Sequence, residues 1–191
     1  MATSIDGNSI NLGSVTLSSS GTTFANSATS VTDAPAGSVV QSATTTASGA
    51  VATSSDGPNA SGLITTLTPR LSGSKFITML SGVTAHSNKT SSDNHGTIYY
   101  MYVSIAGGSY ANVAANVTGS HFINDSIGNW ADFPLTMTYL STPTYTLGQT
   151  VAFQPHYARS TNSSSTCYFH HTGHSAAASQ VYNLTVLEIA S

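Results

Sequence analysis

The sequence predicts an all-β protein, with an antiparallel, jelly-roll-like β-sandwich over residues 37–191 and an extended N-terminal arm over residues 1–36. Hydroxyl residues make up nearly a third of the 191-residue chain, with 32 Ser and 28 Thr, and Thr fits the pleated surface of a strand. Short apolar runs recur between turn residues at a spacing of roughly 10–15 residues, and none of them follows a helical period. The chain has 39% hydrophobic residues and a formal net charge of only −3, so it can bury a core and does not resemble a disordered segment.

The arm over residues 1–36 is rich in Ser, Thr, Gly and Asn. Apolar residues in it predict a short strand pair that is too small to form a core of its own. They are Ile10, Leu12, Val15 and Leu17. Two interpretations of the arm stay open, a flexible tail or a segment that becomes ordered on a partner or on sister subunits.

The first strands of the sandwich follow Pro35. Residues 38–55 predict a long hydroxyl-rich strand with interruptions, and Asp56-Gly57-Pro58-Asn59 predicts a turn. The next strand ends before Pro69, because proline cannot donate to a ladder of hydrogen bonds. Leu63, Thr65 and Leu67 share one face of this strand.

The strand "KFITMLSGV", residues 75–83, has apolar residues on both faces. Phe76 and Leu80 share one face, and Ile77 and Met79 share the other. Two apolar faces imply cover on both sides. We therefore expect the core on one side of this strand and a neighbouring subunit on the other.

The remaining predicted strands alternate with polar loops. Residues 86–96 predict a loop, and Gly107-Gly108 predicts a hairpin turn after the strand that precedes it. One face of that strand carries Tyr99, Met101, Val103 and Ile105, and the other carries Ile98, Tyr100 and Tyr102.

Residues 110–123 predict one further strand and residues 124–133 a loop. The next segment predicts two or three strands, broken at Pro143 and Gly148. The last part of the chain predicts a loop at 160–166, a short strand at 167–171, a loop at 172–179 and a final strand at 180–191. That final strand places Tyr182, Leu184 and Val186 opposite to Leu187 and Ile189.

Three quoted segments carry a family resemblance: "GSVVQ" (37–41), "GLITTLTPRLSGSKFITMLSGV" (62–83) and the closing "YNLTVLEIAS" (182–191). In the last of these, Glu188 stands just before the final aliphatic positions. This order resembles phage tail-fibre and fibre-tip proteins of tailed phages of aquatic bacteria, over roughly residues 37–191. Residues 84–135 and the histidine-bearing loop near the end match nothing specific in that class.

The resemblance implies a homotrimeric β-sandwich at the surface of a virion that binds a host-surface receptor, a glycan or a protein, without catalytic residues. It also implies that the arm attaches to another virion protein of the tail, baseplate or capsid. A capsid decoration or head-fibre protein with no receptor role is the alternative.

Composition excludes several other classes of protein. A net charge of −3 argues against a nucleic-acid partner, which requires a basic face. No apolar run approaches the ~20 residues of a membrane span, so we expect no membrane insertion. The start "MATSIDGNSINLG" shows neither a basic nor an apolar signal region, which disfavours a secreted lectin. One cysteine, Cys167, cannot form an internal disulfide.

The segment "NDSIGNWADF" supplies the candidate receptor contacts. It contains the single tryptophan, Trp130, between Asp125 and Asp132, with Asn129 alongside and His121 nearby. Sugar recognition requires an aromatic face together with carboxylate or amide groups, and this set provides both. The alternative is that Trp130 fills the end of the sandwich core.

The segment "CYFHHTGH" places Cys167, His170, His171 and His174 close together, and both imidazole and thiolate suit zinc. A closed site needs a fourth ligand with known spacing, and the sequence offers none. We therefore predict no metal and no cofactor, and we expect these histidines to present hydrogen bonds to solvent or ligand. Whether they hold an ion in an assembly stays open.

The sequence predicts no enzymatic activity. It has no G-x-S-x-G turn and no helix on which a hydrolytic triad could be placed. Glycoside hydrolysis needs two carboxylates flanking a cleft. Asp125 with Asp132 is the one pair that could be considered for it.

Overall fold

The computed structural model describes residues 9–12, 15–18, 34–88, 95–113, 119–123, 130–159, 166–170 and 180–191. Every regular element in these ranges is a β-strand, and every strand pairing is antiparallel. The predicted all-β class is therefore confirmed. The described part of the chain contains no helix that could cross a membrane.

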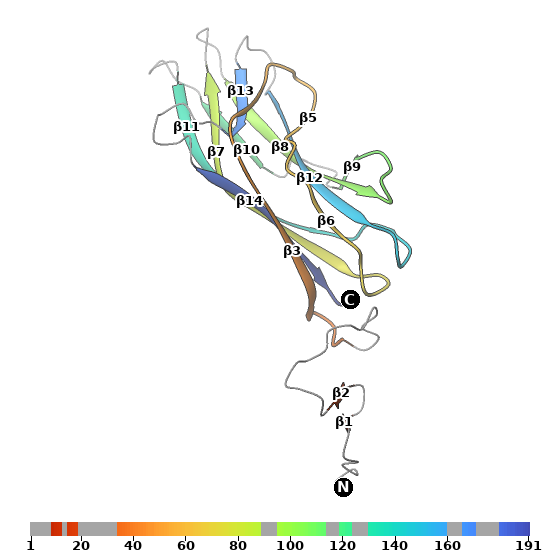
Figure 1. The fold of residues 1–191 in the computed structure, drawn as a ribbon. Helices are drawn as coiled ribbons and strands as arrows, with labels where there is room; N and C mark the ends of the chain where they lie inside the picture. Colours follow the sequence, from red (N-terminus) through yellow and green to blue (C-terminus); the bar gives the residue numbers. More distant parts are fainter. Residues whose placement is uncertain are drawn as a thin grey trace.

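The strands from β3 onward form two six-stranded sheets (Figure 1). The β7 sheet comprises β3 (Val39–Ser48), β4 (Val51–Thr53), β7 (Lys75–Asn88), β11 (Trp130–Ser141), β13 (Thr166–His170) and β14 (Val181–Ile189). The β8 sheet comprises β5 (Asn59–Ala60), β6 (Thr65–Leu67), β8 (His95–Ile105), β9 (Ala111–Asn112), β10 (Gly119–Ile123) and β12 (Val151–Arg159).

A separate two-stranded hairpin precedes these sheets. Strands β1 (Ser9–Leu12) and β2 (Val15–Ser18) pair so that Ile10 lies opposite Leu17 and Leu12 lies opposite Val15. The strand pair predicted within the arm is confirmed.

The β7 sheet is organised around its longest strand. One side of β7 pairs with β11, and the other side pairs first with β14 and then with β13. Gly82 lies where β7 passes from β14 to β13, with a φ of 74°. A Cβ atom at this position would lie 2.6 Å from the backbone oxygen of Val181, so only glycine fits here.

The final strand is held on both sides, because β14 lies between β3 and β7. The interrupted strand predicted at 38–55 is β3 followed by β4, separated at Gly49, whose φ is 97°. In the β8 sheet, a turn over residues 106–110 joins β8 to its partner β9, which confirms the hairpin predicted there.

The facing sides of the two sheets enclose one hydrophobic core. Rings from the two sheets meet directly: the Phe76 and Phe153 centroids are 5.4 Å apart, and those of Tyr157 and Phe169 are 5.7 Å apart. Each such side chain contributes ~1.5–3 kcal/mol when fully buried. The alternation separated two faces of several strands, and the structure shows which face is buried. The buried residues are Leu63, Thr65, Leu67, Phe76, Leu80, Tyr99, Met101, Val103, Tyr182, Leu184 and Val186, and Ile105 packs against them partly buried.

Three predicted segments differ from the structure. The loop predicted at 86–96 is shorter, because β7 continues to Asn88 and β8 begins at His95. The segment 124–133 is not a loop throughout, because β11 already begins at Trp130. It continues through Pro134, which the structure accommodates because β11 pairs only with β7 among the described strands and has a bulge between Leu135 and Met137. The single strand predicted at 110–123 is two short strands, β9 and β10.

Candidate functional site

The segment that leads into β3 meets the C-terminus at one end of the sheets. The Gly37 amide donates to the Ala190 carbonyl at 2.8 Å, and the Ala190 amide donates to the Ser38 carbonyl at 2.9 Å. Figure 1 shows the C-terminus beside the start of β3. We call this the terminal end.

The opposite end of the β7 sheet is reached along β7 itself, which runs from Lys75, opposite Ile189, to Asn88. A strand of this length spans about 40 Å. Asn88 lies opposite both Trp130 and Thr166. We call this the loop end.

The β8 sheet also has strand ends at the loop end. Ile123 lies opposite His95, and Arg159 lies opposite Thr97. The strand ends that flank three connections are therefore gathered here. The connections are residues 89–94, 124–129 and 160–165.

An ion pair also lies at the loop end. Arg159 Nε is 2.7 Å from Asp56 Oδ1, and this hydrogen bond lowers the pKa of the Asp56 carboxyl. The Arg159 amide donates to the Ser55 carbonyl at 2.9 Å. Asp56 remains 54% exposed, so the pair ties β12 to the turn after β4 without burying a charge.

The predicted receptor contacts are distributed over two strands and a segment outside the described residues. Trp130 and Asp132 lie on β11, opposite Asn88 and His86. His121 lies on β10 of the other sheet, opposite Thr97. Asp125 and Asn129 fall outside the described residues. A ligand-binding or core role for Trp130 stays a prediction.

His170 contradicts the expectation that these histidines face solvent or ligand. It is fully buried in β13, where Nδ1 accepts a hydrogen bond from the Thr84 amide at 3.1 Å. The centroids of the His170 and Tyr182 rings are 4.6 Å apart. The side chain packs inward because a bulge between Tyr168 and His170 changes the alternation of the strand.

The other predicted metal ligands do not join His170 within the described residues. Cys167 is buried and free, and burial raises the pKa of its thiol to about 11. His171 and His174 fall outside the described residues. The described ranges bring together no group of three His, Cys, Asp or Glu side chains that could hold a metal ion.

Glu188, the single glutamate of the chain, is fully buried at the terminal end. Its carboxylate accepts hydrogen bonds from the amides of Arg70 and Leu71 at 3.0 Å, and from Ser74 Oγ at 2.7 Å. Gln41 Nε2 donates to it at 2.6 Å and also donates to the Thr68 carbonyl. The carboxylate therefore organises the 68–74 turn by acting as its shared acceptor.

This contact gives a physical reason for the sequence pattern that defined the resemblance. The Pro-Arg-Leu-Ser-Gly-Ser turn and the acidic residue near the C-terminus lie more than a hundred positions apart, yet they form one hydrogen-bonded unit. Gln41, in the first quoted segment, completes that unit. The three segments of the pattern therefore meet at this end of the structure.

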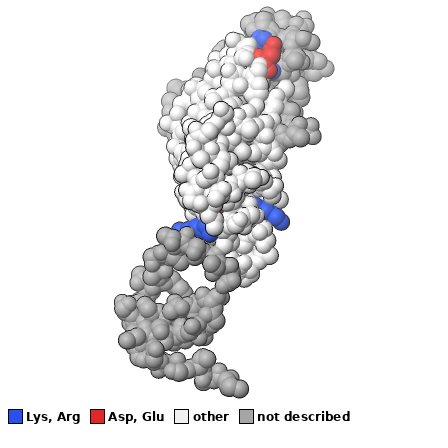
Figure 2. Space-filling view, turned by 90° about the vertical axis from the view of Figure 1, so that its right-hand side faces the viewer, with Lys and Arg blue, Asp and Glu red and all other residues white. Residues whose placement is uncertain are grey.

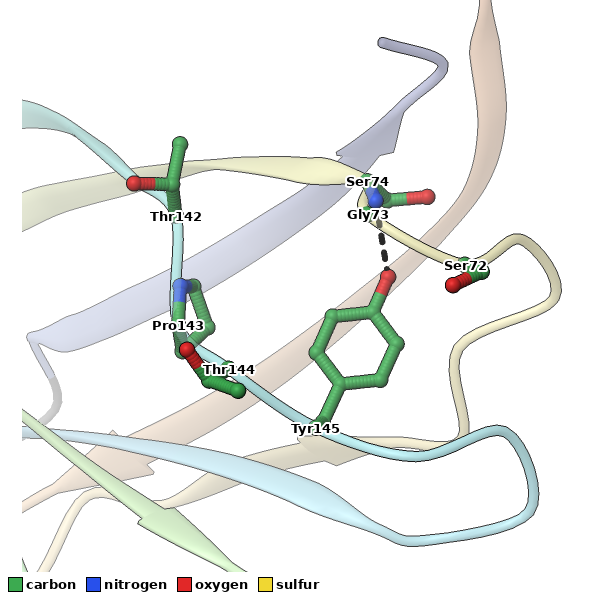
Figure 3. Close-up of a pocket in the computed structure, with 7 residues that line it drawn as sticks. All are labelled: Ser72, Gly73, Ser74, Thr142, Pro143, Thr144 and Tyr145. Carbon is green, nitrogen blue, oxygen red and sulfur yellow. Dashed lines mark hydrogen bonds between the residues drawn. The ribbon is translucent and has the colours of Figure 1, made fainter.

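A pocket of about 340 Å³ lies next to this turn (Figure 3). The Tyr145 hydroxyl closes one side of it, donating to the Leu71 carbonyl at 2.6 Å and accepting from the Ser74 amide at 2.8 Å. The lining carries hydroxyl and backbone groups but no carboxylate, imidazole or thiol. The lining residues are Ser72, Gly73, Ser74, Thr142, Pro143, Thr144 and Tyr145.

The outer side of the β7 sheet carries an aliphatic surface. Leu140 on β11, Ile77 on β7 and Leu187 on β14 lie in register across three strands. Leu140 is 53% exposed, and Ile77 and Leu187 are partly exposed. Together with Met79 and Ile189 we call these residues the aliphatic face. The predicted outward orientation of Ile77 and Met79 is confirmed.

The sequence reasoning missed an aromatic cluster on the outer side of the β8 sheet. Tyr100 and Tyr102 were expected as core or interface rims, and neither Tyr110 nor His156 was singled out. The period-two spacing of Tyr100 and Tyr102 was the available signal, but their partners come from another strand and from a turn.

Neither the family models nor the curated proteins contain a match to this chain.

Proposed function

We propose that this protein is a phage tail-fibre or fibre-tip component whose two six-stranded sheets form a jelly-roll-like β-sandwich that assembles as a homotrimer on the virion surface. It binds a host-surface glycan or protein without performing chemistry. The single observation that carries the proposal is the separation of the two ends of the sheets. Residues 37 and 38, which follow the arm, lie at the terminal end, and the strand ends flanking three connections lie at the other.

The separation of the terminal end from the loop end suits an attachment protein. Loops held on a rigid scaffold are the usual carriers of recognition, and the three connections are held by paired strands. The arm over residues 1–36 attaches to another virion protein at the terminal end. The receptor then meets the loop end, with Trp130, Asp132 and His121 on the strands that lead to it.

Trimer formation is supported by the aliphatic face. An exposed row of Leu140, Ile77 and Leu187 on a sheet is unfavourable in water, and burial against sister subunits removes that cost. Closed threefold symmetry covers the same surface on every copy. It also presents three copies of each loop, so weak single contacts act together.

Sedimentation of the full chain tests the assembly. We expect a trimer at micromolar concentration, and we expect Leu140→Asp to give monomers because it places a charge in the contact. Thr66→Asp is the matched control, since Thr66 is exposed on the other sheet. A monomeric wild-type protein at micromolar concentration refutes the proposed interface.

Electron microscopy of particles with a label on Ser191 tests the location. Density on tail appendages supports the proposal, while density restricted to the capsid points to a decoration protein.

Host adsorption by particles carrying Trp130→Ala tests the recognition end. Loss of adsorption at an unchanged melting temperature supports a receptor contact, and a large fall in melting temperature points to a core residue.

A further inference from the structure

Four rings lie together on the outer side of the β8 sheet. Tyr102 stacks on His156, with centroids 3.9 Å apart and planes 13° apart. Tyr100 meets Tyr102 edge-on at 6.4 Å, and Tyr110 lies 6.1 Å from His156. We call these four residues the aromatic platform. All four are partly exposed.

Strand register builds this platform. Tyr100 lies opposite His156 and Tyr102 lies opposite Gln154 in the β8–β12 pair, so the Tyr102–His156 stack runs along a diagonal. The turn after β8 brings Tyr110 back over the same strands. Because the rings support one another, a ligand would meet a surface that needs little further ordering.

The imidazole of His156 is uncharged at physiological pH. His156 Nε2 lies 3.1 Å from Gln154 Oε1, an acceptor, so Nε2 carries the proton and Nδ1 presents a lone pair. Burial lowers the pKa of His156, which keeps the ring uncharged. Nδ1 is buried, and the described residues offer it no hydrogen-bond donor.

The charged side chains of the described residues lie toward the two ends of the sheets. The side of the molecule that carries β9 and β12 shows Lys, Arg, Asp and Glu atoms only near its two ends (Figure 2). The described basic side chains, Arg70, Lys75 and Arg159, lie at the terminal end or the loop end. A surface of this kind does not favour a phosphate, a uronic acid or a sialic acid.

We propose that the aromatic platform is a binding site for pyranose rings of a neutral saccharide, separate from the loop end. The C–H face of a sugar ring carries partial positive charge and packs on the negative face of an aromatic ring. The Tyr hydroxyls provide directional partners for the sugar hydroxyls at the edge of these rings. The aliphatic face of the other sheet has no such polar groups, which suits contact with protein instead.

The proposal rests on the proposed function only for the biological source of the sugar, because the binding itself is a property of the isolated chain. The test uses full-length protein on an array of neutral and acidic glycans. Isothermal titration with the best neutral oligosaccharide follows, on wild type and on the variants Tyr102→Leu and Tyr110→Leu. Tyr110 lies in a turn before β9, so its replacement leaves the strands intact even where Tyr102→Leu lowers stability.

We expect binding to at least one class of neutral glycan, with a loss of about tenfold or more in affinity for each variant. Leu140→Asp on the other sheet is the control, and its affinity per chain should stay within about twofold of wild type, well below a tenfold change. Absence of neutral-glycan binding, selectivity for acidic glycans or unchanged affinity in both variants overturns the proposal. A changed sedimentation coefficient in the tyrosine variants also overturns it, because the platform would then contact a second copy of the chain.

These outcomes are independent of the proposed function. A virion protein that adsorbs through its loops remains possible where the platform binds no sugar. Saccharide binding by the purified chain likewise stands where electron microscopy places the protein elsewhere.

Discussion

Replacing Glu188 tests whether a buried carboxylate holds the terminal end together. The side chain is fully buried and receives donors from Gln41, Arg70, Leu71 and Ser74. Glu188→Ala removes the acceptor and leaves these four donors in a site that excludes water.

The size of the effect follows from the number of hydrogen-bond donors that are left without an acceptor. Each buried group left without a partner costs ~1–3 kcal/mol, and water entering the space left by the side chain recovers part of this. Removing one member of a buried charged network typically costs ~3–5 kcal/mol. We therefore expect Glu188→Ala to lower the free energy of unfolding by about 3–5 kcal/mol, a large part of the ~5–15 kcal/mol of a whole domain.

Glu188→Gln keeps the shape of the side chain but changes its charge and its number of acceptor oxygens. It keeps the volume of the side chain but turns one acceptor oxygen into a donor, which then faces Gln41 Nε2 and the Arg70 amide. Hydrogen bonds to a charged acceptor are also about twice as strong as neutral ones. We expect a loss of about 2 kcal/mol, smaller than that of the alanine variant.

Urea denaturation of the full chain, followed by far-ultraviolet circular dichroism at one fixed protein concentration, measures these differences. A fixed concentration matters because self-association contributes to apparent stability. Asp56→Asn is the matched control, since it also converts a carboxylate to an amide but at an exposed ion pair, and we expect no measurable loss. A Glu188→Gln protein as stable as wild type, or a loss below about 1 kcal/mol for Glu188→Ala, contradicts the reasoning.

Three further predictions concern single positions. Gly82→Ala should cost about 2–5 kcal/mol, because it combines left-handed strain with a backbone clash, whereas Gly107→Ala, with a similar φ but open space, should cost only about 1–2 kcal/mol. Equal losses of unfolding free energy in the two variants, measured by urea denaturation, would contradict the proposed clash. Cys167 should react with a thiol reagent at pH 8 only when the protein unfolds, since burial raises the pKa of the thiol to about 11, and labelling of native protein at the rate of a free thiol would refute this. The lowered pKa of His156 means that the unfolded chain binds more protons below pH 6.5, so its contribution to stability at neutral pH is lost as the pH falls from 6.5 through the lower folded pKa. The fall in melting temperature from pH 7 to pH 5 should therefore be smaller in His156→Gln than in wild type, and an equal fall would remove His156 as a cause.

Alternation along single strands was predictable because it is a local property. Successive side chains of a strand point to opposite faces, so the sequence grouped the residues of 63–67 and 182–186 that the structure buries together. The prediction that His170 faces solvent or ligand is wrong, because a bulge lies next to this residue and no residue type signals it. The loop predicted at 124–133 ended too late, because β11 begins at Trp130 and continues through Pro134.

The candidate sites depend on contacts between distant parts of the chain. Glu188 was noticed as part of a pattern, but its role required the turn at 68–74 to lie against β14. Tyr102 and His156 stack because β8 pairs with β12 in one particular register, and a shift by one residue would point them to opposite faces.

The sequence by itself determined that this chain forms strands, which residues of most strands share a face and where several turns lie. These properties follow from side-chain chemistry and the two-residue repeat of a strand, which need no knowledge of neighbours. Only the tertiary structure decided which strands pair and in what register, because antiparallel pairing can join segments at any separation along the chain. It therefore also decided that the terminal and loop ends lie apart, that the single glutamate is buried, and that four rings meet on an outer face.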